Sequence, residues 1–291
     1  MSVQDHFSSV SATYAAARPG YPDALFDLLA RHVPADARVW EPGCGSGQAT
    51  RGLAARFAHV HATDPSPQQL GEHWAARRPD GRVSLAVEPG ERTALADGSV
   101  GLVAVAQALH WFDLPAFFAE CDRVLRPGGL LAAWGYPDFE VPEGMQDAVV
   151  AFRREVEGDW PLGRSLVDAH YAAFDWPFER IDVPSLWLQA DWTLDRLLAY
   201  LSSYSAVVRH RARTGVDAVA AHGRDWPRPG ATPAGCGRSA GRCSCTSGAS
   251  RWQAAGRVCG RAARACVPAP RCTVPAPGPA GRAARAQPRL H

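Results

Sequence analysis

The stretch Trp40-Glu41-Pro42-Gly43-Cys44-Gly45-Ser46-Gly47 decides the fold of this 291-residue chain. It ends a predicted strand over Ala37–Glu41 and leads into a predicted helix over Gln48–Phe57. Three glycines at alternate positions let the backbone turn tightly and approach a ligand closely. A dinucleotide-binding loop has the spacing G-x-G-x-x-G, but here the third glycine comes one residue early. The loop therefore suits a ligand that has no pyrophosphate.

Strands alternate with helices on both sides of this loop. The further predicted strands are His59–Thr63, Arg82–Val87, Val100–Ala106 and Leu130–Trp134, and the helices between and before them are Pro22–Val33, Pro67–Arg77 and Pro115–Leu125. This alternation predicts an α/β fold with a Rossmann-like, doubly wound, mostly parallel sheet in the strand order 3-2-1-4-5. Later in the chain we predict helices over Glu143–Glu157, Leu166–Ala173 and Thr193–Val208, and a sixth strand over Ile181–Ala190.

A carboxylate stands at the end of the second predicted strand. Asp64 follows Glu41 by 23 residues, a position from which a carboxylate can accept hydrogen bonds from both hydroxyls of a ribose. The alternative is an ordinary turn or helix-capping aspartate before Pro65. Together with the shortened glycine loop, Asp64 indicates S-adenosylmethionine (SAM), which has an amino-acid end, a ribose and an adenine but no phosphate.

Three further segments follow in order: Gly90-Glu91, the run Gln107–Phe112, and the run Arg123–Leu130. With the glycine loop and Asp64, they resemble the class I SAM-dependent methyltransferases that have a methyltransferase type 11 domain. A narrower resemblance, to the trans-aconitate methyltransferase-like branch, is carried by Tyr14, Arg18-Pro19, Tyr21-Pro22, Gln107–Asp113 and Tyr200–Ala206. That family usually has Asp after the Ser99-Val100 pair, where this chain has Gly101.

The resemblance implies a role for each residue of a cofactor site. These residues are Glu41, Gly43, Gly45 and Gly47 for the amino-acid end of SAM, Asp64 for the ribose, the backbone around Glu91 for the adenine, Gln107 near the methionine moiety, and Tyr14 and Arg18 as an N-terminal lid.

Methyl transfer from a sulfonium is an in-line displacement, so catalysis consists largely of positioning and of excluding water. A carboxylate acceptor needs no general base, whereas a hydroxyl or amine would, and His110 is then the candidate catalytic residue. The alternative for His110 is a structural role. We expect methyl transfer to a small-molecule acceptor, with a carboxylate as the candidate group. The alternative is a SAM-binding protein with lost or impaired catalysis that acts by interaction.

Two other classes fit less well. The glycine spacing disfavours an NAD-dependent oxidoreductase. An acidic core disfavours a nucleic-acid methyltransferase, because nucleic-acid binding calls for a basic face. No leader is evident over Met1–Val10, and no apolar run reaches about 18 residues. We expect a cytoplasmic, monomeric protein without a membrane partner or a metal.

The end of the chain differs sharply from the rest. Residues 1–221 contain 19 Arg and 28 acidic residues, whereas residues 222–291 contain 12 Arg, one acidic residue and six of the eight cysteines. We therefore predict a methyltransferase domain over 1–220 and a disordered, basic tail rich in Cys, Pro, Gly and Ala over 221–291. A real disordered tail and a slipped reading frame both explain it, and we favour the second. The antiparallel seventh strand of the fold is then expected to be missing, with loss of stability and activity.

Overall fold

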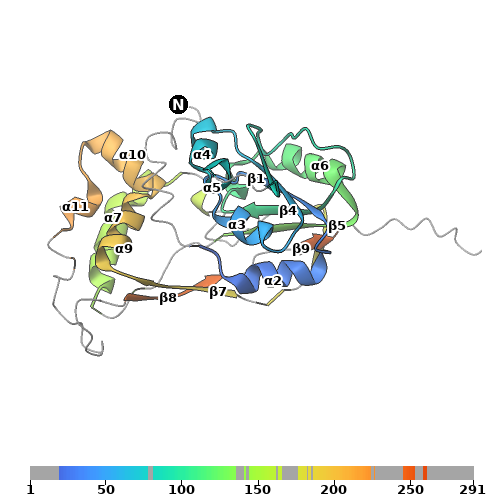
Figure 1. The fold of residues 1–291 in the computed structure, drawn as a ribbon. Helices are drawn as coiled ribbons and strands as arrows, with labels where there is room; N and C mark the ends of the chain where they lie inside the picture. Colours follow the sequence, from blue (N-terminus) through green and yellow to red (C-terminus); the bar gives the residue numbers. More distant parts are fainter. Residues whose placement is uncertain are drawn as a thin grey trace, which may run out of the picture.

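A mostly parallel sheet forms the centre of the fold in the computed structural model, which describes residues 20–77, 81–135, 141, 144–161, 163–165, 176–181, 183–184, 186–223, 226, 245–252 and 258–260 (Figure 1). Its first five strands are β1 (Arg38–Pro42), β2 (His59–Thr63), β3 (Val83–Ala86), β4 (Val100–Ala106) and β5 (Leu125–Trp134). They pair in parallel in the order β3-β2-β1-β4-β5. The predicted fold class and strand order are confirmed.

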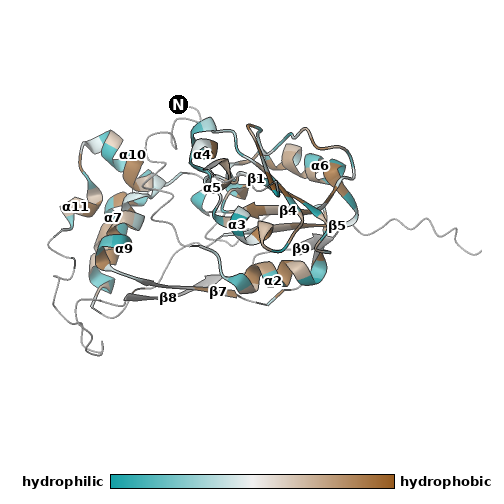
Figure 2. Cartoon of the chain, in the orientation of Figure 1, coloured by the Kyte–Doolittle hydropathy of each residue, from teal (hydrophilic) through white to brown (hydrophobic). Residues whose placement is uncertain are grey.

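Helices cover both faces of the sheet because alternate side chains of the buried strands point to opposite sides. On one face Val39 and Leu102 belong to an apolar cluster with residues of α2 (Asp23–His32) and α3 (Gln48–Ala54). On the other face Trp40 and Val103 belong to a second cluster with residues of α6 (Leu114–Val124). Figure 2 shows the mainly apolar strands at the centre and the mixed hydropathy of the helices around them.

Gly101, where the resembling family usually has Asp, lies in this core. A Cβ at this position would lie 2.8 Å from the Cβ of Ala37 and 3.2 Å from a guanidinium nitrogen of Arg126. The space that an aspartate would need is thus filled by these two neighbours.

Two predicted helices are each divided in two. The helix predicted over Pro67–Arg77 consists of α4 (Pro67–Glu72) and α5 (Trp74–Arg77), because His73 between them has an extended backbone and turns its ring toward the glycine loop. The helix predicted over Thr193–Val208 consists of α9 (Leu194–Ser202) and α10 (Ser205–Thr214). Thr193 caps α9, as predicted, by accepting a hydrogen bond from the Arg196 amide.

A group of helices lies beyond the end of the sheet, on the left of Figure 1. It consists of α7 (Gln146–Val156), the short helix η3 (Glu157–Asp159), α9, α10 and α11 (Ala218–Ala221). The ring of Phe152 packs against those of Tyr204 and Trp226, with centroids 6.4 and 6.2 Å away. The helix predicted over Leu166–Ala173 lies outside the described residues. Within the part of the chain that is described, no helix combines the length and the apolar character needed to cross a membrane.

The prediction of one sixth strand over Ile181–Ala190 is wrong. The structure has two strands there, β6 (Glu179–Ile181) in the central sheet and β7 (Leu186–Trp192) in a separate two-stranded sheet with β8 (Cys245–Trp252). Pro184 lies between them and lacks the amide hydrogen that would continue a ladder.

The expectation of a missing seventh strand is also wrong. The short strand β9 (Val258–Gly260) lies between β5 and β6 and pairs antiparallel with both. Strand pairing uses only backbone amide and carbonyl groups, so a segment without an apolar pattern can occupy this place. The predicted boundary at residue 220 and the disorder of the rest of the tail stay predictions.

Candidate functional site

The glycine loop connects β1 to α3, and all three of its glycines have left-handed backbones. The φ angles of Gly43, Gly45 and Gly47 are +68°, +55° and +89°. A Cβ at Gly43 would lie 2.6 Å from the Cβ of Ala108, and a Cβ at Gly47 would lie 2.7 Å from Cδ2 of His73. Both the backbone angles and these close neighbours require glycine.

Asp64 follows β2 and holds the glycine loop by its side chain. Its Oδ2 accepts a hydrogen bond from the Gly45 amide and its Oδ1 accepts one from the Ser66 amide, each at 2.9 Å. Burial raises the pKa of Asp64, while these two amides favour the ionised form. A carboxylate has about four acceptor positions, so capacity for two further hydroxyl donors is left. The turn role and the ribose role are therefore compatible.

Glu41 in β1 is almost completely buried, at 1% exposure, behind the same loop. Neither oxygen of its side chain has a hydrogen-bond partner in the described structure. Burial raises the pKa of Glu41 to about 8; the hydroxyl and amide of Thr50 act against this shift, and the charge of Asp64 adds to it. A carboxyl without partners at the base of a glycine loop is a place for a cationic ligand group.

Three residues that the sequence reasoning missed support the third glycine. His73 is fully buried, and its Nε2 lies 2.9 Å from the Oγ1 of Thr50 in α3. The indole of Trp74 donates a hydrogen bond of 3.1 Å to the carbonyl oxygen of Gly47. The sequence has no local signal for these contacts, since His73 is one of several polar residues in the predicted helix Pro67–Arg77.

The loop after β3 lies next to the first glycine. A Cβ at Gly90 would lie 2.6 Å from the ring of Phe112, and a Cβ at Gly43 would lie 3.2 Å from the same ring. Phe112 therefore contacts both the glycine loop and the loop that is expected to meet the adenine. The Oε1 of Glu91 accepts a hydrogen bond of 2.8 Å from the Asp113 amide at the start of α6.

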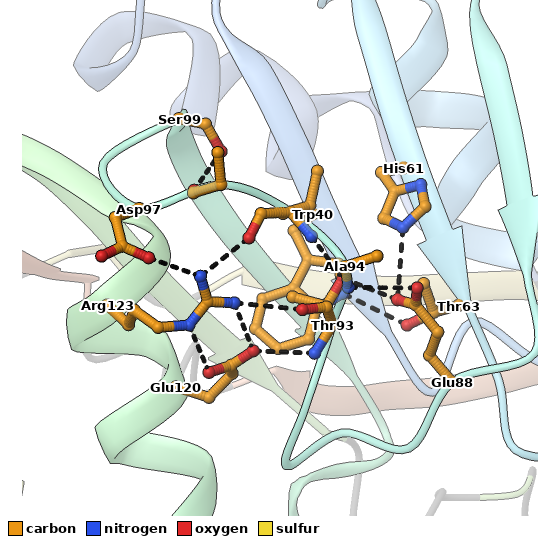
Figure 3. Close-up of polar contacts among 12 residues, drawn as sticks. Trp40, His61, Thr63, Glu88, Thr93, Ala94, Asp97, Ser99, Glu120 and Arg123 are labelled. Atoms are coloured by element: carbon orange, nitrogen blue, oxygen red, sulfur yellow. Dashed lines mark hydrogen bonds and ion pairs between the residues drawn. The ribbon is translucent and has the colours of Figure 1, made fainter.

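Arg123 in α6 binds the other end of this loop (Figure 3). Its guanidinium donates to both carboxyl oxygens of Glu120, to Asp97, and to the carbonyl oxygens of Leu95 and Thr93, over 2.6–3.0 Å. Glu120 in turn accepts a hydrogen bond of 2.7 Å from the Thr93 amide. The loop is thus attached to α6 at both ends.

The run after β4 carries the candidate catalytic residue. Gln107 has a φ of +56°, which is strained for a residue other than glycine and is typical of functional sites. His110 lies in a short helix, η2 (Leu109–Trp111), with its ring centroid 4.9 Å from that of Trp111. A Cβ at Gly163 would lie 2.8 Å from the His110 carbonyl oxygen, so the segment after η3 packs directly against His110.

The structure thus brings Glu41, the three loop glycines and Asp64 together, with the Gly90-Glu91 loop beside them. Tyr14 and Arg18 lie outside the described residues, so their lid role stays a prediction. Among the residues that the structure describes, no cluster of His, Cys, Asp and Glu could hold a metal ion.

These residues fit SAM. The unpartnered carboxyl of Glu41 suits an ammonium group, Asp64 has acceptor capacity for ribose hydroxyls, and the glycines leave the backbone accessible to a ligand. The individual contacts remain expectations.

Comparison with known proteins agrees with this site. Residues 40–133 match the family model described as a methyltransferase domain. A Dictyostelium discoideum protein named as a methyltransferase is 33% identical over 207 residues, which cover 69% of this chain and 77% of the relative. The malonyl-[acyl-carrier protein] O-methyltransferase of Hahella chejuensis is 36% identical over 135 residues, 44% of this chain and about half (47%) of the relative.

A solved structure is similar as well. It is described as a type II methyltransferase from Anaeromyxobacter dehalogenans, with 40% identity, a TM-score of 0.64, and coverage of 72% of this chain and 87% of that one. The narrower trans-aconitate methyltransferase-like resemblance stays a prediction. The fold, the glycine loop and these relatives together show that the chain belongs to the class I SAM-dependent methyltransferases and uses SAM as its methyl donor.

Proposed function

We propose that this enzyme transfers the methyl group of SAM to a carboxylate oxygen of a small-molecule acceptor. The observation that carries the proposal is an arginine next to the His110 segment. The guanidinium carbon of Arg164 lies 4.3 Å from the centre of the Trp160 ring, and the preceding residue, Gly163, packs against His110. The N–H groups of an arginine form a planar fork that matches a carboxylate, and contact with an aromatic ring restricts where that fork can lie.

The name of one relative agrees with this acceptor. The Hahella protein is named for methyl transfer to oxygen on a malonyl group, which carries a carboxylate. Because this chain spans only about half of that relative, the shared chemistry is proposed as a class of acceptor and not as the same substrate.

A carboxylate acceptor changes what is required of the protein. It is ionised at neutral pH and can attack without a general base. Bound SAM supplies a methyl group that its sulfonium has already activated. The residues of this chain then have to align the acceptor and keep water out. In this proposal His110 contacts and positions the acceptor, and Arg164 holds the charge of its carboxylate.

A labelled-methyl assay on a panel of small carboxylic acids tests the proposal, with alcohols, amines, RNA and DNA as controls. The panel includes unsaturated tricarboxylic acids because of the trans-aconitate methyltransferase-like resemblance. We expect a labelled methyl ester, which mild alkali releases as methanol. A product that resists alkali would contradict the proposal. Binding of S-adenosylhomocysteine (SAH) without transfer to any acceptor would favour the alternative of lost catalysis.

The variant Arg164→Gln tests the arginine. Loss of a charge-assisted hydrogen bond should raise the KM of the acid about 10- to 100-fold while SAH affinity stays the same. The matched control is Arg154→Gln, which removes an exposed arginine from α7. Equal kinetics for the two variants would rule out Arg164 as the carboxylate-binding residue.

A further inference from the structure

The starting observation is the isolation of Glu41 in the core. Its carboxyl is buried, and neither oxygen is hydrogen bonded in the described structure. The Thr50 amide and hydroxyl are near enough to lower its pKa, although neither meets the geometry of a hydrogen bond to it. An ionised carboxylate in such a place would be costly. With burial raising its pKa to about 8, Glu41 is mostly the neutral acid at pH 7.

The hydrogen bonds around His73 define which ring nitrogen carries the proton. The Ala75 amide donates to Nδ1 of His73 at 3.1 Å, so Nδ1 carries a lone pair. In the neutral ring Nε2 then carries the hydrogen and donates it to the Oγ1 of Thr50 at 2.9 Å. Burial lowers the pKa of His73 to about 4, so the ring stays neutral at pH 6 and above.

This arrangement orients the Thr50 hydroxyl. Its oxygen accepts from His73, so its single hydrogen has to be donated in another direction, and the carboxyl of Glu41 lies next to it. His73 cannot easily move away, because its ring is fully buried against Gly47.

We propose that Thr50 and His73 are positioning residues for the amino-acid end of SAM: His73 fixes the Thr50 hydroxyl so that it donates to Glu41 when that carboxylate faces the ammonium group of the cofactor. Binding then removes one proton from the Glu41 carboxyl to solvent. The resulting carboxylate is shared between the ammonium group and the Thr50 hydroxyl. The inference depends on the cofactor of the family and is independent of the acceptor.

The other titratable groups facing Glu41 are Asp64 after β2, Cys44 in the glycine loop and, through Thr50, His73. Burial raises the pKa of the Cys44 thiol well above its ordinary value, so the thiol stays neutral. Asp64 accepts two amide hydrogen bonds that favour its ionised form. Glu41 has no such hydrogen bonds in the described structure, and burial raises its pKa to about 8.

Calorimetric titration of the full chain with SAH tests this directly. Titrations in phosphate and in Tris, whose ionisation enthalpies differ, give the number of protons released for each SAH bound. We expect close to one proton at pH 6.5 and fewer at pH 8.5. The Glu41 carboxyl of the free protein has to lose this proton for SAH to bind. SAH affinity should therefore increase up to tenfold for each unit by which the pH is raised toward about 8, and it should level off above that pH.

Two matched pairs of variants test the positioning residues. Thr50→Val removes the hydroxyl, whereas Thr50→Ser keeps it; His73→Met removes the donor, whereas His73→Gln keeps an amide donor. Loss of a hydrogen bond to a charged group should weaken SAH binding about 10- to 100-fold at pH 6.5 in the first member of each pair. The loss should be smaller at pH 8.5, because there Glu41 is already partly ionised before SAH binds.

The pH dependence separates positioning from a merely structural role. A merely structural defect would weaken SAH binding equally at pH 6.5 and pH 8.5. That result would overturn the proposal for any variant that melts at the same temperature as the other member of its matched pair. SAH binding to the wild type without proton release would overturn it too, while leaving the cofactor assignment intact. Failure of the wild type to bind SAH at all would overturn both.

Discussion

The variant Gly47→Ala should lower the free energy of unfolding by about 2–5 kcal/mol. Gly47 has a φ of +89°, and an L-residue in the left-handed region costs roughly 1–2 kcal/mol. The added Cβ would also lie 2.7 Å from Cδ2 and Cε1 of His73. Because His73 is fully buried and bound to both Thr50 and the Ala75 amide, its ring cannot turn away, and overpacking adds about 1–3 kcal/mol.

Urea unfolding and thermal melting measure this loss. For a domain of this size each kcal/mol lowers the melting temperature by about 2–4 °C, so a decrease of about 4–20 °C is expected. The matched control is Gly215→Ala: its φ is +76°, but a Cβ there would have no neighbour within 4 Å. This control should lose only the roughly 1–2 kcal/mol of backbone strain and bind SAH normally.

A double variant isolates the contact with the ring. In the background of His73→Ala, the substitution Gly47→Ala should cost only the backbone strain, because the ring is gone. An equal cost in both backgrounds would refute the clash, and so would a Gly47→Ala protein as stable as the wild type.

Three further predictions follow from the polar contacts. Arg123→Met should lower the free energy of unfolding, measured in urea, by roughly 2–4 kcal/mol, because the side chain of Glu120, 10% exposed, loses its partner. Adding Glu120→Gln should recover part of this loss. Strictly additive costs of the two substitutions would contradict the pairing. The Arg213 guanidinium holds the pKa of Asp159 below its ordinary value, so the ion pair stabilises the fold at neutral pH, and this stabilisation is lost as the pH falls below about 4. The free energy of unfolding should therefore decrease less steeply with falling pH in Asp159→Asn than in the wild type. Identical slopes would contradict the linkage. Asp64→Asn should weaken SAH binding about 10- to 100-fold in calorimetry, because an amide nitrogen cannot accept from a hydroxyl; unchanged affinity would remove Asp64 from the ribose site.

Several features of the site could be predicted because their signals are local. Positive φ angles favour glycine, so the spacing of Gly43, Gly45 and Gly47 already indicates a tight turn between strand and helix. Asp64 is predictable for a similar reason, since the end of the second strand and its distance from the loop can be counted along the chain. Alternation of strands and helices predicts the order of the first five strands through the handedness of the crossovers.

Other features depend on contacts between distant segments, which a local pattern does not encode. The sequence of Pro67–Arg77 predicts one helix, and only packing against Gly47 and Thr50 shows why His73 interrupts it. The ladder position of β9 is likewise decided by backbone pairing, for which side-chain patterns carry little information.

The sequence by itself determined the family fold, the glycine loop and the carboxylate after the second strand, because a backbone angle or a strand end restricts which residue can stand there. The tertiary structure alone decided the environment of these residues. The resemblance assigns Glu41 to the amino-acid end of SAM, but only its surroundings, buried and with no hydrogen-bond partner among the described residues, make it a largely neutral acid beneath the loop. The physical reason is that desolvation and hydrogen bonding depend on the side chains that surround a group in space, and the sequence does not list those neighbours together.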